Sequence, residues 1–140
     1  MSTTEIYEKV SAGIWNTYFK FSCVRNPWER MLSCYEFEKI KFGYKEPFSL
    51  FLCERGYFWD NSRVYGFMGD LNLDDFVRFE SLEYDIKRIL QKLSLKALPN
   101  VPKEVEKRLS YVDSYNSTTK RLVERRHKKE ISLFDYKFGE

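Results

Sequence analysis

The chain has 140 residues, 43% hydrophobic and 18% aromatic, with a formal net charge of +3. This length and composition predict a single domain with a packed core. The mild positive charge suits an anionic ligand but falls short of the strongly basic balance of nucleic-acid binders. No apolar run is long enough to span a bilayer and no secretory leader opens the chain, so we expect a cytoplasmic protein without a membrane span.

The first predicted elements are a helix and a strand. Ser2-Thr3-Thr4-Glu5 has the spacing of a capping box, which predicts a short helix over residues 4–12 that ends near Gly13. The apolar run over residues 19–24 then has the length and the aromatic and β-branched content of a buried strand.

A tight turn and a second helix follow this strand at once. Asn26 is a good N-cap, Pro27 suits the first helical position, and Glu29 stands where a capping box places its acid. Free N–H groups at a helix start attract anions, and Arg25 immediately precedes them. The pattern therefore indicates a site for a phosphate.

Two more residues of this helix are candidates for the same site. Arg30 adds a positive charge in the first turn, and Ser33, about two turns into the helix, offers a hydroxyl. The alternative is that the strand, turn and helix are only scaffold, with Arg25 solvated. The pattern alone favours that alternative, because helix N-termini bind anions far less often than they occur.

The middle of the chain gives weaker signals. Gly43 ends the second helix, and the apolar run over residues 48–53 fits a helix slightly better than a strand. We then expect a long loop up to Leu73 whose aromatic residues pack in the core rather than stack on a sugar or adenine. These aromatic residues are Tyr57, Phe58, Trp59, Tyr65 and Phe67.

Strand and helix signals alternate again in the second half. Residues 75–79 predict a strand, and apolar residues at helical spacing over residues 82–93 predict a helix with a Glu83–Lys87 pair on its exposed face. A last helix is expected over residues 117–129, with a solvated basic face. The alternation predicts an α/β fold with a mainly parallel sheet.

The cysteines and the histidine point to no metal site. Cys23, Cys34 and Cys53 are widely spaced and odd in number, so we expect free thiols, with Cys23 and Cys34 buried. His127 is the only histidine of the chain and lies in the basic helix, where a structural role is favoured. No metal is expected.

The stretch CVRNPWERMLSCY resembles the 3′-phosphate-binding segment of sulfotransferases that use 3′-phosphoadenosine 5′-phosphosulfate (PAPS). It is most similar to the Golgi carbohydrate sulfotransferases and their bacterial and viral relatives, which carry the pattern RNP-x-x-R-x-x-S-x-Y after a strand. Every element of that pattern is present, as Arg25, Asn26, Pro27, Arg30, Ser33 and Tyr35. The resemblance implies that Arg25 and Ser33 hold the 3′-phosphate of the nucleotide.

Two later stretches resemble the same family, in the same order. DFVRFESL at residues 75–82 is similar to its RFE-x-L turn, and Tyr111–Phe138 is similar to a tyrosine-rich turn, a helix and a closing aromatic motif, here FDYKF. The resemblance implies a P-loop-type nucleotide-binding fold, with helices flanking the sheet. It also makes Arg108, Tyr111 and Tyr115 candidates for contact with the nucleotide.

One part of the family pattern has no counterpart in this sequence. Sulfotransferases bind the 5′-phosphosulfate with a lysine-bearing loop after their first strand, and the 18 residues before Phe19 contain no such loop. The chain thus resembles the C-terminal part of a sulfotransferase. It is expected to form one domain over residues 1–140 that is incomplete at its N-terminus, as a gene fragment, a truncated chain or a natural short form.

Several consequences follow from this partial resemblance. The fold lacks its first strand, and the open sheet edge predicts self-association. No catalytic base or catalytic lysine is identified, because both Glu80 and His127 fit structural roles better. A eukaryotic member of the family would lie in the Golgi lumen.

The leading functional hypothesis is transfer of a sulfuryl group from PAPS to a hydroxyl, of a carbohydrate by resemblance, although this chain alone is expected to bind nucleotide weakly and turn over little. The second hypothesis is a catalytically inactive nucleotide-binding or interaction module derived from a sulfotransferase. The third is nucleic-acid binding, suggested by the basic C-terminal helix and the many aromatic residues, and it is the least favoured.

Overall fold

The computed structural model describes residues 2–56, 61, 64, 66–67, 70–71, 73–96 and 110–140. The chain divides into two compact units. Unit 1 contains residues 1–24 and 61–103, and unit 2 contains residues 25–60 and 104–140. Each unit thus combines two segments that are far apart in the sequence, and the single domain expected from chain length stays a prediction.

Unit 1 begins with two short helices, α1 (Thr3–Lys9) and α2 (Ala12–Thr17). The predicted capping box is confirmed, because the Ser2 hydroxyl accepts from the Glu5 N–H and the Glu5 carboxylate accepts from the Ser2 N–H. The first helix ends at Lys9, earlier than expected, because the Ser11 side chain caps a second helix that runs through Gly13.

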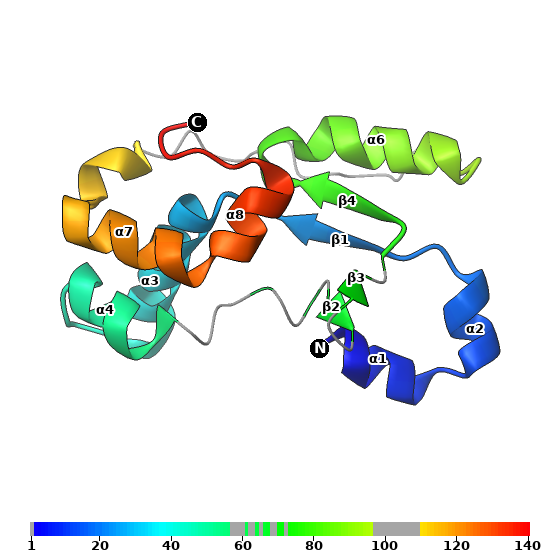
Figure 1. The fold of residues 1–140 in the computed structure, drawn as a ribbon, viewed down its shortest axis with the longest axis horizontal. Helices are drawn as coiled ribbons and strands as arrows, with labels where there is room; N and C mark the ends of the chain where they lie inside the picture. The colour runs from blue at the N-terminus through cyan, green and yellow to red at the C-terminus, as the bar shows by residue number, and fades with distance from the viewer. Residues whose placement is uncertain are drawn as a thin grey trace. The chain divides into compact units, whose positions relative to one another are not determined.

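A parallel pair of strands forms the centre of unit 1. Strand β1 (Phe21–Val24) pairs with β4 (Asp75–Arg78), so that Phe21 lies opposite Asp75. The turn η2 (Phe79–Ser81) and helix α6 (Leu82–Lys92) follow, and α6 packs against β4 (Figure 1). Two short antiparallel strands, β2 (Gly66–Phe67) and β3 (Asp70–Leu71), also belong to this unit, so the prediction of a loop throughout this stretch is wrong. The α/β class and the parallel pairing are confirmed.

Burial along β1 alternates from residue to residue. Ser22 and Val24 are buried, whereas Phe21 is 50% exposed and Cys23 is exposed. The prediction that Phe21 and Cys23 are buried is therefore wrong. Successive side chains of a strand point to opposite faces of the sheet, and in this pair one face of β1 is open. All three cysteines are free thiols, and Cys34 is only half-buried.

Charged side chains join α6 to both the start and the end of β4. The Arg88 guanidinium lies 2.6 Å from Asp75 Oδ2 and also donates to the Phe76 carbonyl. Its hydrogen bond holds the pKa of Asp75 down, at about 2. Burial works to raise the pKa of Asp85, but hydrogen bonds from the Arg78 N–H and the Ser81 hydroxyl bring it below its usual value.

Unit 2 is mainly helical. It contains α3 (Pro27–Phe42), α4 (Phe48–Glu54), η3 (Tyr111–Ser114), α7 (Ser117–Arg126) and α8 (Lys128–Phe134). Helices α3, α4 and α7 pack on one another (Figure 1). Helix α3 ends at Gly43 in a left-handed conformation, as predicted, and the apolar run over residues 48–53 is helical, as favoured. The buried core of this unit consists of Trp28, Met31, Phe51, Leu52, Val123, Phe134 and Tyr136.

The last predicted helix is in fact two helices. Helix α7 stops at His127, which is buried, and α8 starts there. The basic face of this region is exposed, as predicted. One of its members is nevertheless engaged, because the Arg126 guanidinium donates to the carbonyls of Leu52 and Cys53 at the end of α4.

Several sequence-based expectations fall outside the described residues. These are Arg108 and the loop aromatics Tyr57, Phe58, Trp59 and Tyr65, together with the side chain of Phe67. Within the described part of the chain, no helix has both the length and the apolar character needed to cross a membrane.

Candidate functional site

The Arg25 turn leads into a helix start whose amides are mostly engaged. The Asn26 side chain accepts from the Trp28 N–H at 3.1 Å, and the Asn26 carbonyl accepts from the Arg30 N–H at 2.9 Å. Pro27 has no N–H. These bonds leave the N–H of Glu29 as the first-turn amide able to meet an anion. The positive charge for a phosphate must therefore come chiefly from a side chain.

Arg25 is the cationic residue next to this helix start, and it lies against a carboxylate. Its Nη2 is 2.7 Å from Glu29 Oε1, and the two side chains are 12% and 22% exposed. Glu29 thus does not close the predicted capping box, because its carboxylate pairs with Arg25 instead. The pair holds the guanidinium beside the first turn of α3, in partial contact with solvent.

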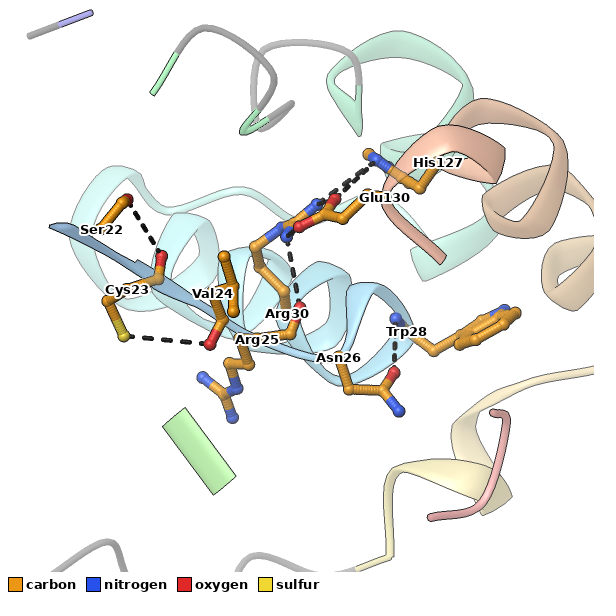
Figure 2. A network of polar contacts seen from close by, with 9 residues as sticks. All are labelled: Ser22, Cys23, Val24, Arg25, Asn26, Trp28, Arg30, His127 and Glu130. Atoms are coloured by element: carbon orange, nitrogen blue, oxygen red, sulfur yellow. Dashed lines mark hydrogen bonds and ion pairs between the residues drawn. The ribbon is translucent and has the colours of Figure 1, made fainter. Parts of the chain in front are cut away.

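Arg30 lies on the other side of the same turn. Its guanidinium is buried and pairs with Glu130 of α8 through two bonds, Nη1–Oε1 at 2.5 Å and Nη2–Oε2 at 2.6 Å. The side chains of Arg25 and Arg30 point in opposite directions (Figure 2). The sequence predicts Arg30 as a second charge for the anion, whereas in the structure its guanidinium is buried against Glu130, because a buried guanidinium needs a counter-charge.

Ser33 stands in the second turn of α3 and is half-buried. It is four residues after Glu29, so the two side chains lie on one face of the helix. Since Glu29 pairs with Arg25, Ser33 lies on the face of α3 that carries this ion pair. The other residue of the pattern, Tyr35, is used for packing: its hydroxyl donates to the Glu46 carbonyl at 3.0 Å, and its ring contacts Phe51.

Tyr111 lies beside the helix cap. Its hydroxyl accepts from Asn26 Nδ2 at 3.3 Å and from the Gly139 N–H at 2.6 Å. Tyr111, a candidate for contact with the nucleotide from the C-terminal half of the chain, therefore touches Asn26, the residue that follows Arg25. Asn26 Nδ2 also donates to the Lys137 carbonyl at 3.0 Å, a contact that the sequence does not predict, although Lys137 lies in the closing FDYKF stretch.

Aromatic rings fix η3 to the first turn of α3. Trp28, Tyr111, Tyr115 and Phe138 form edge-to-face pairs with ring centroids 5.5 to 6.3 Å apart. The Tyr115 hydroxyl donates to the Trp28 carbonyl at 2.7 Å, and burial raises the pKa of Tyr115. Tyr115 is thus bound within this aromatic cluster, whereas the Tyr111 hydroxyl contacts the Asn26 cap.

The described residues contain no group of three or more His, Cys, Asp or Glu side chains that could hold a metal ion. The polar groups at or near the Arg25 turn include the Arg25 guanidinium, the Glu29 N–H and, on the same face of α3, Ser33. All of these groups can donate hydrogen bonds to an anion, and a bond from the charged guanidinium is stronger than one from a neutral donor.

The model of the sulfotransferase family matches residues 2–64, a range that runs from α1 through α4. This segment is sulfotransferase-like. The matched range includes the whole RNP pattern from Arg25 to Tyr35, with the helix that positions it. The resemblance of residues 75–82 and 111–138, and the assignment of the chain to the C-terminal part of such an enzyme, stay predictions. No curated protein and no solved structure matches the chain.

Proposed function

We propose that this chain provides the nucleotide-binding part of a sulfotransferase that takes its sulfuryl group from PAPS, and that Arg25 and Ser33 hold the 3′-phosphate. One observation carries the proposal. In the sulfotransferase-like segment, the Arg25 guanidinium is held at the first turn of α3 by Glu29, on the face that also carries Ser33. Tyr111, beside the Asn26 cap, is the further candidate for contact with the nucleotide.

Sulfuryl transfer needs an acceptor hydroxyl in line with the sulfur. The acceptor oxygen forms a bond to sulfur, the bond from sulfur to the 5′-phosphate oxygen breaks, and the hydroxyl proton passes to a base. Binding of the 3′-phosphate, which is distant from the sulfur, contributes energy that orients the reacting end of PAPS. This is the part we assign to Arg25 and Ser33, within a P-loop-type fold, with a carbohydrate hydroxyl as the proposed acceptor.

A second candidate function is nucleotide binding without turnover. The chain's one histidine, His127, is 4% exposed and lies against Arg30 and Glu130, so it does not reach an acceptor as a base. A module of this kind would bind the same nucleotide through the same residues. Assay of sulfate transfer from PAPS to sugar acceptors separates the two functions, because only the enzyme releases adenosine 3′,5′-bisphosphate.

Calorimetric titration with adenosine 3′,5′-bisphosphate tests the site itself, with adenosine 5′-monophosphate as the ligand that lacks the 3′-phosphate. A hydrogen bond to a charged group contributes about 1.5–3 kcal/mol, so Arg25→Ala should lose roughly tenfold to a hundredfold in affinity. Arg121→Ala, which removes an exposed arginine of α7, is the matched control and should bind like the wild type. Equal affinity for the two nucleotides would refute the 3′-phosphate site.

A further inference from the structure

A buried cluster of three charged or titratable side chains joins α3 to α8. Arg30 lies in the first turn of α3, and His127 and Glu130 lie at the start of α8. The side chains of Arg30 and Glu130 are 8% and 2% exposed, and their bidentate contact has bonds of 2.5 and 2.6 Å. The planar guanidinium of Arg30, here called the Arg30 fork, makes two short bonds to one carboxylate and therefore has little rotational freedom.

The contact with Arg30 also favours one tautomer of a neutral His127 ring. Arg30 Nη2 lies 3.3 Å from His127 Nδ1. A guanidinium only donates hydrogen bonds, so Nδ1 must be the acceptor, and the neutral ring carries its proton on Nε2. Glu130 Oε2 is 3.7 Å from the same Nδ1. The imidazole ring therefore lies beside the Arg30 guanidinium and further restricts the orientation of that guanidinium.

The fork reaches the residue that we propose for the phosphate. Arg30 Nη1 donates to the backbone carbonyl of Arg25 at 3.4 Å (Figure 2). The Arg25 carbonyl thus faces the buried cluster, while the Arg25 side chain points the other way, toward Glu29. Holding a carbonyl restrains the plane of its peptide bond. A restrained plane limits the movement of the adjoining Cα, and so limits the positions from which the Arg25 side chain can extend.

We infer that Arg30, Glu130 and His127 act as one positioning unit for Arg25. Helix α8 holds the Arg30 fork, and the fork holds the Arg25 carbonyl, so the orientation of the Arg25 side chain depends on residues about a hundred positions later in the chain. None of the three touches the ligand. The identity of the ligand rests on the proposed function, whereas the restraint of the turn does not.

Two substitutions of His127 separate positioning from simple stability. His127→Asn places an amide oxygen near the position of Nδ1 and can still accept from Arg30, whereas His127→Leu cannot. In His127→Leu we expect faster amide hydrogen exchange at Trp28 and Arg30, whose N–H groups bond within the turn, and affinity for adenosine 3′,5′-bisphosphate lower by about threefold to tenfold. His127→Asn should restore both. Glu130→Gln, which weakens the fork, should resemble His127→Leu.

The matched control is the second ion pair of α3, between Glu38 and Arg55, with Oε2–Nη1 at 2.6 Å. Glu38→Gln breaks this pair far from the turn, so it should lower stability without changing exchange at Trp28 or the affinity. The proposal is overturned if Glu38→Gln weakens binding as much as His127→Leu, or if the Leu and Asn variants exchange alike. A wild-type chain that does not bind the nucleotide refutes the proposed function, while the exchange comparison still decides the positioning unit. If Glu130→Gln does not fold, the two His127 variants decide alone.

Discussion

Arg25 and Glu29 form an ion pair across the first turn of α3, with Nη2 2.7 Å from Oε1. The acid expected to close a capping box instead neutralises the arginine that we propose for the phosphate. A phosphate that approaches Arg25 therefore meets a carboxylate as well as a guanidinium. Glu29 has two effects on such a ligand, because it orients the guanidinium and repels the anion.

Substitution of Glu29 separates these two effects. Glu29→Gln keeps an oxygen that can accept from Arg25 but removes the negative charge, so affinity for adenosine 3′,5′-bisphosphate should rise by about threefold to tenfold. Calorimetric titration measures the change, and the gain should shrink at high salt. Glu36→Gln, on the exposed part of the same helix, should leave the affinity unchanged. Weaker binding by Glu29→Gln would show that orientation outweighs repulsion.

The buried Arg30–Glu130 pair should be costly to break from one side. Glu130→Ala leaves a guanidinium buried without its carboxylate, and such losses are about 3–5 kcal/mol in free energy of unfolding. Replacing both partners by apolar residues, Arg30→Met with Glu130→Leu, should cost less than Glu130→Ala alone. Urea unfolding of the single and double variants gives the comparison. Losses that simply add would argue against a coupled pair.

The Asp75–Arg88 contact should make stability depend on pH. The pKa of Asp75 is about 2, below its ordinary value of 3.8, so the folded state favours the charged carboxylate. The resulting stabilisation is present above pH of about 4 and is lost as pH falls toward 2. It amounts to at most about 2 kcal/mol, since the Arg88 side chain is partly exposed and screened by solvent.

Urea unfolding of the wild type and of Asp75→Asn, between pH 6 and roughly pH 2, measures this effect. The difference in free energy of unfolding between the two proteins should be largest near pH 6 and should narrow below pH of about 4. Protonation of Asp75 then removes the negative charge that the Asn variant lacks at every pH. Asp113→Asn, an exposed carboxylate of η3, serves as the control. A difference that stays constant over the whole range would contradict the assignment.

Two glycine substitutions should change stability in opposite directions. A Cβ at Gly56 would lie 2.9 Å from Arg126 Nη1, so Gly56→Ala displaces the guanidinium from the Leu52 and Cys53 carbonyls and should destabilise by about 1 kcal/mol. Gly13 lies inside α2, where the nearest atom to an added Cβ is 3.9 Å away. Gly13→Ala should therefore stabilise by about 0.5–1 kcal/mol. Thermal unfolding of both variants is the measurement, and a stabilised Gly56→Ala would contradict the role of Arg126.

Elements that depend on near neighbours were predictable from the sequence. The Ser2–Glu5 capping box and the Asn26–Pro27 helix start are each specified by residues within one helical turn. The exposed Glu83–Lys87 pair, at 2.7 Å, is of the same kind. The Arg25 turn also belongs to this class, because a cap, a proline and an arginine in succession define it locally.

Only the tertiary structure decided what surrounds that turn. The sequence could not show that Arg30 pairs with Glu130, or that Tyr111 meets the Asn26 cap, because those partners are 100 and 85 residues away. It could not show that Phe21 is half exposed either. Caps and helix stops are satisfied by atoms a few residues apart, whereas the partner of a buried charge and the covering of a sheet face are chosen by packing between distant segments.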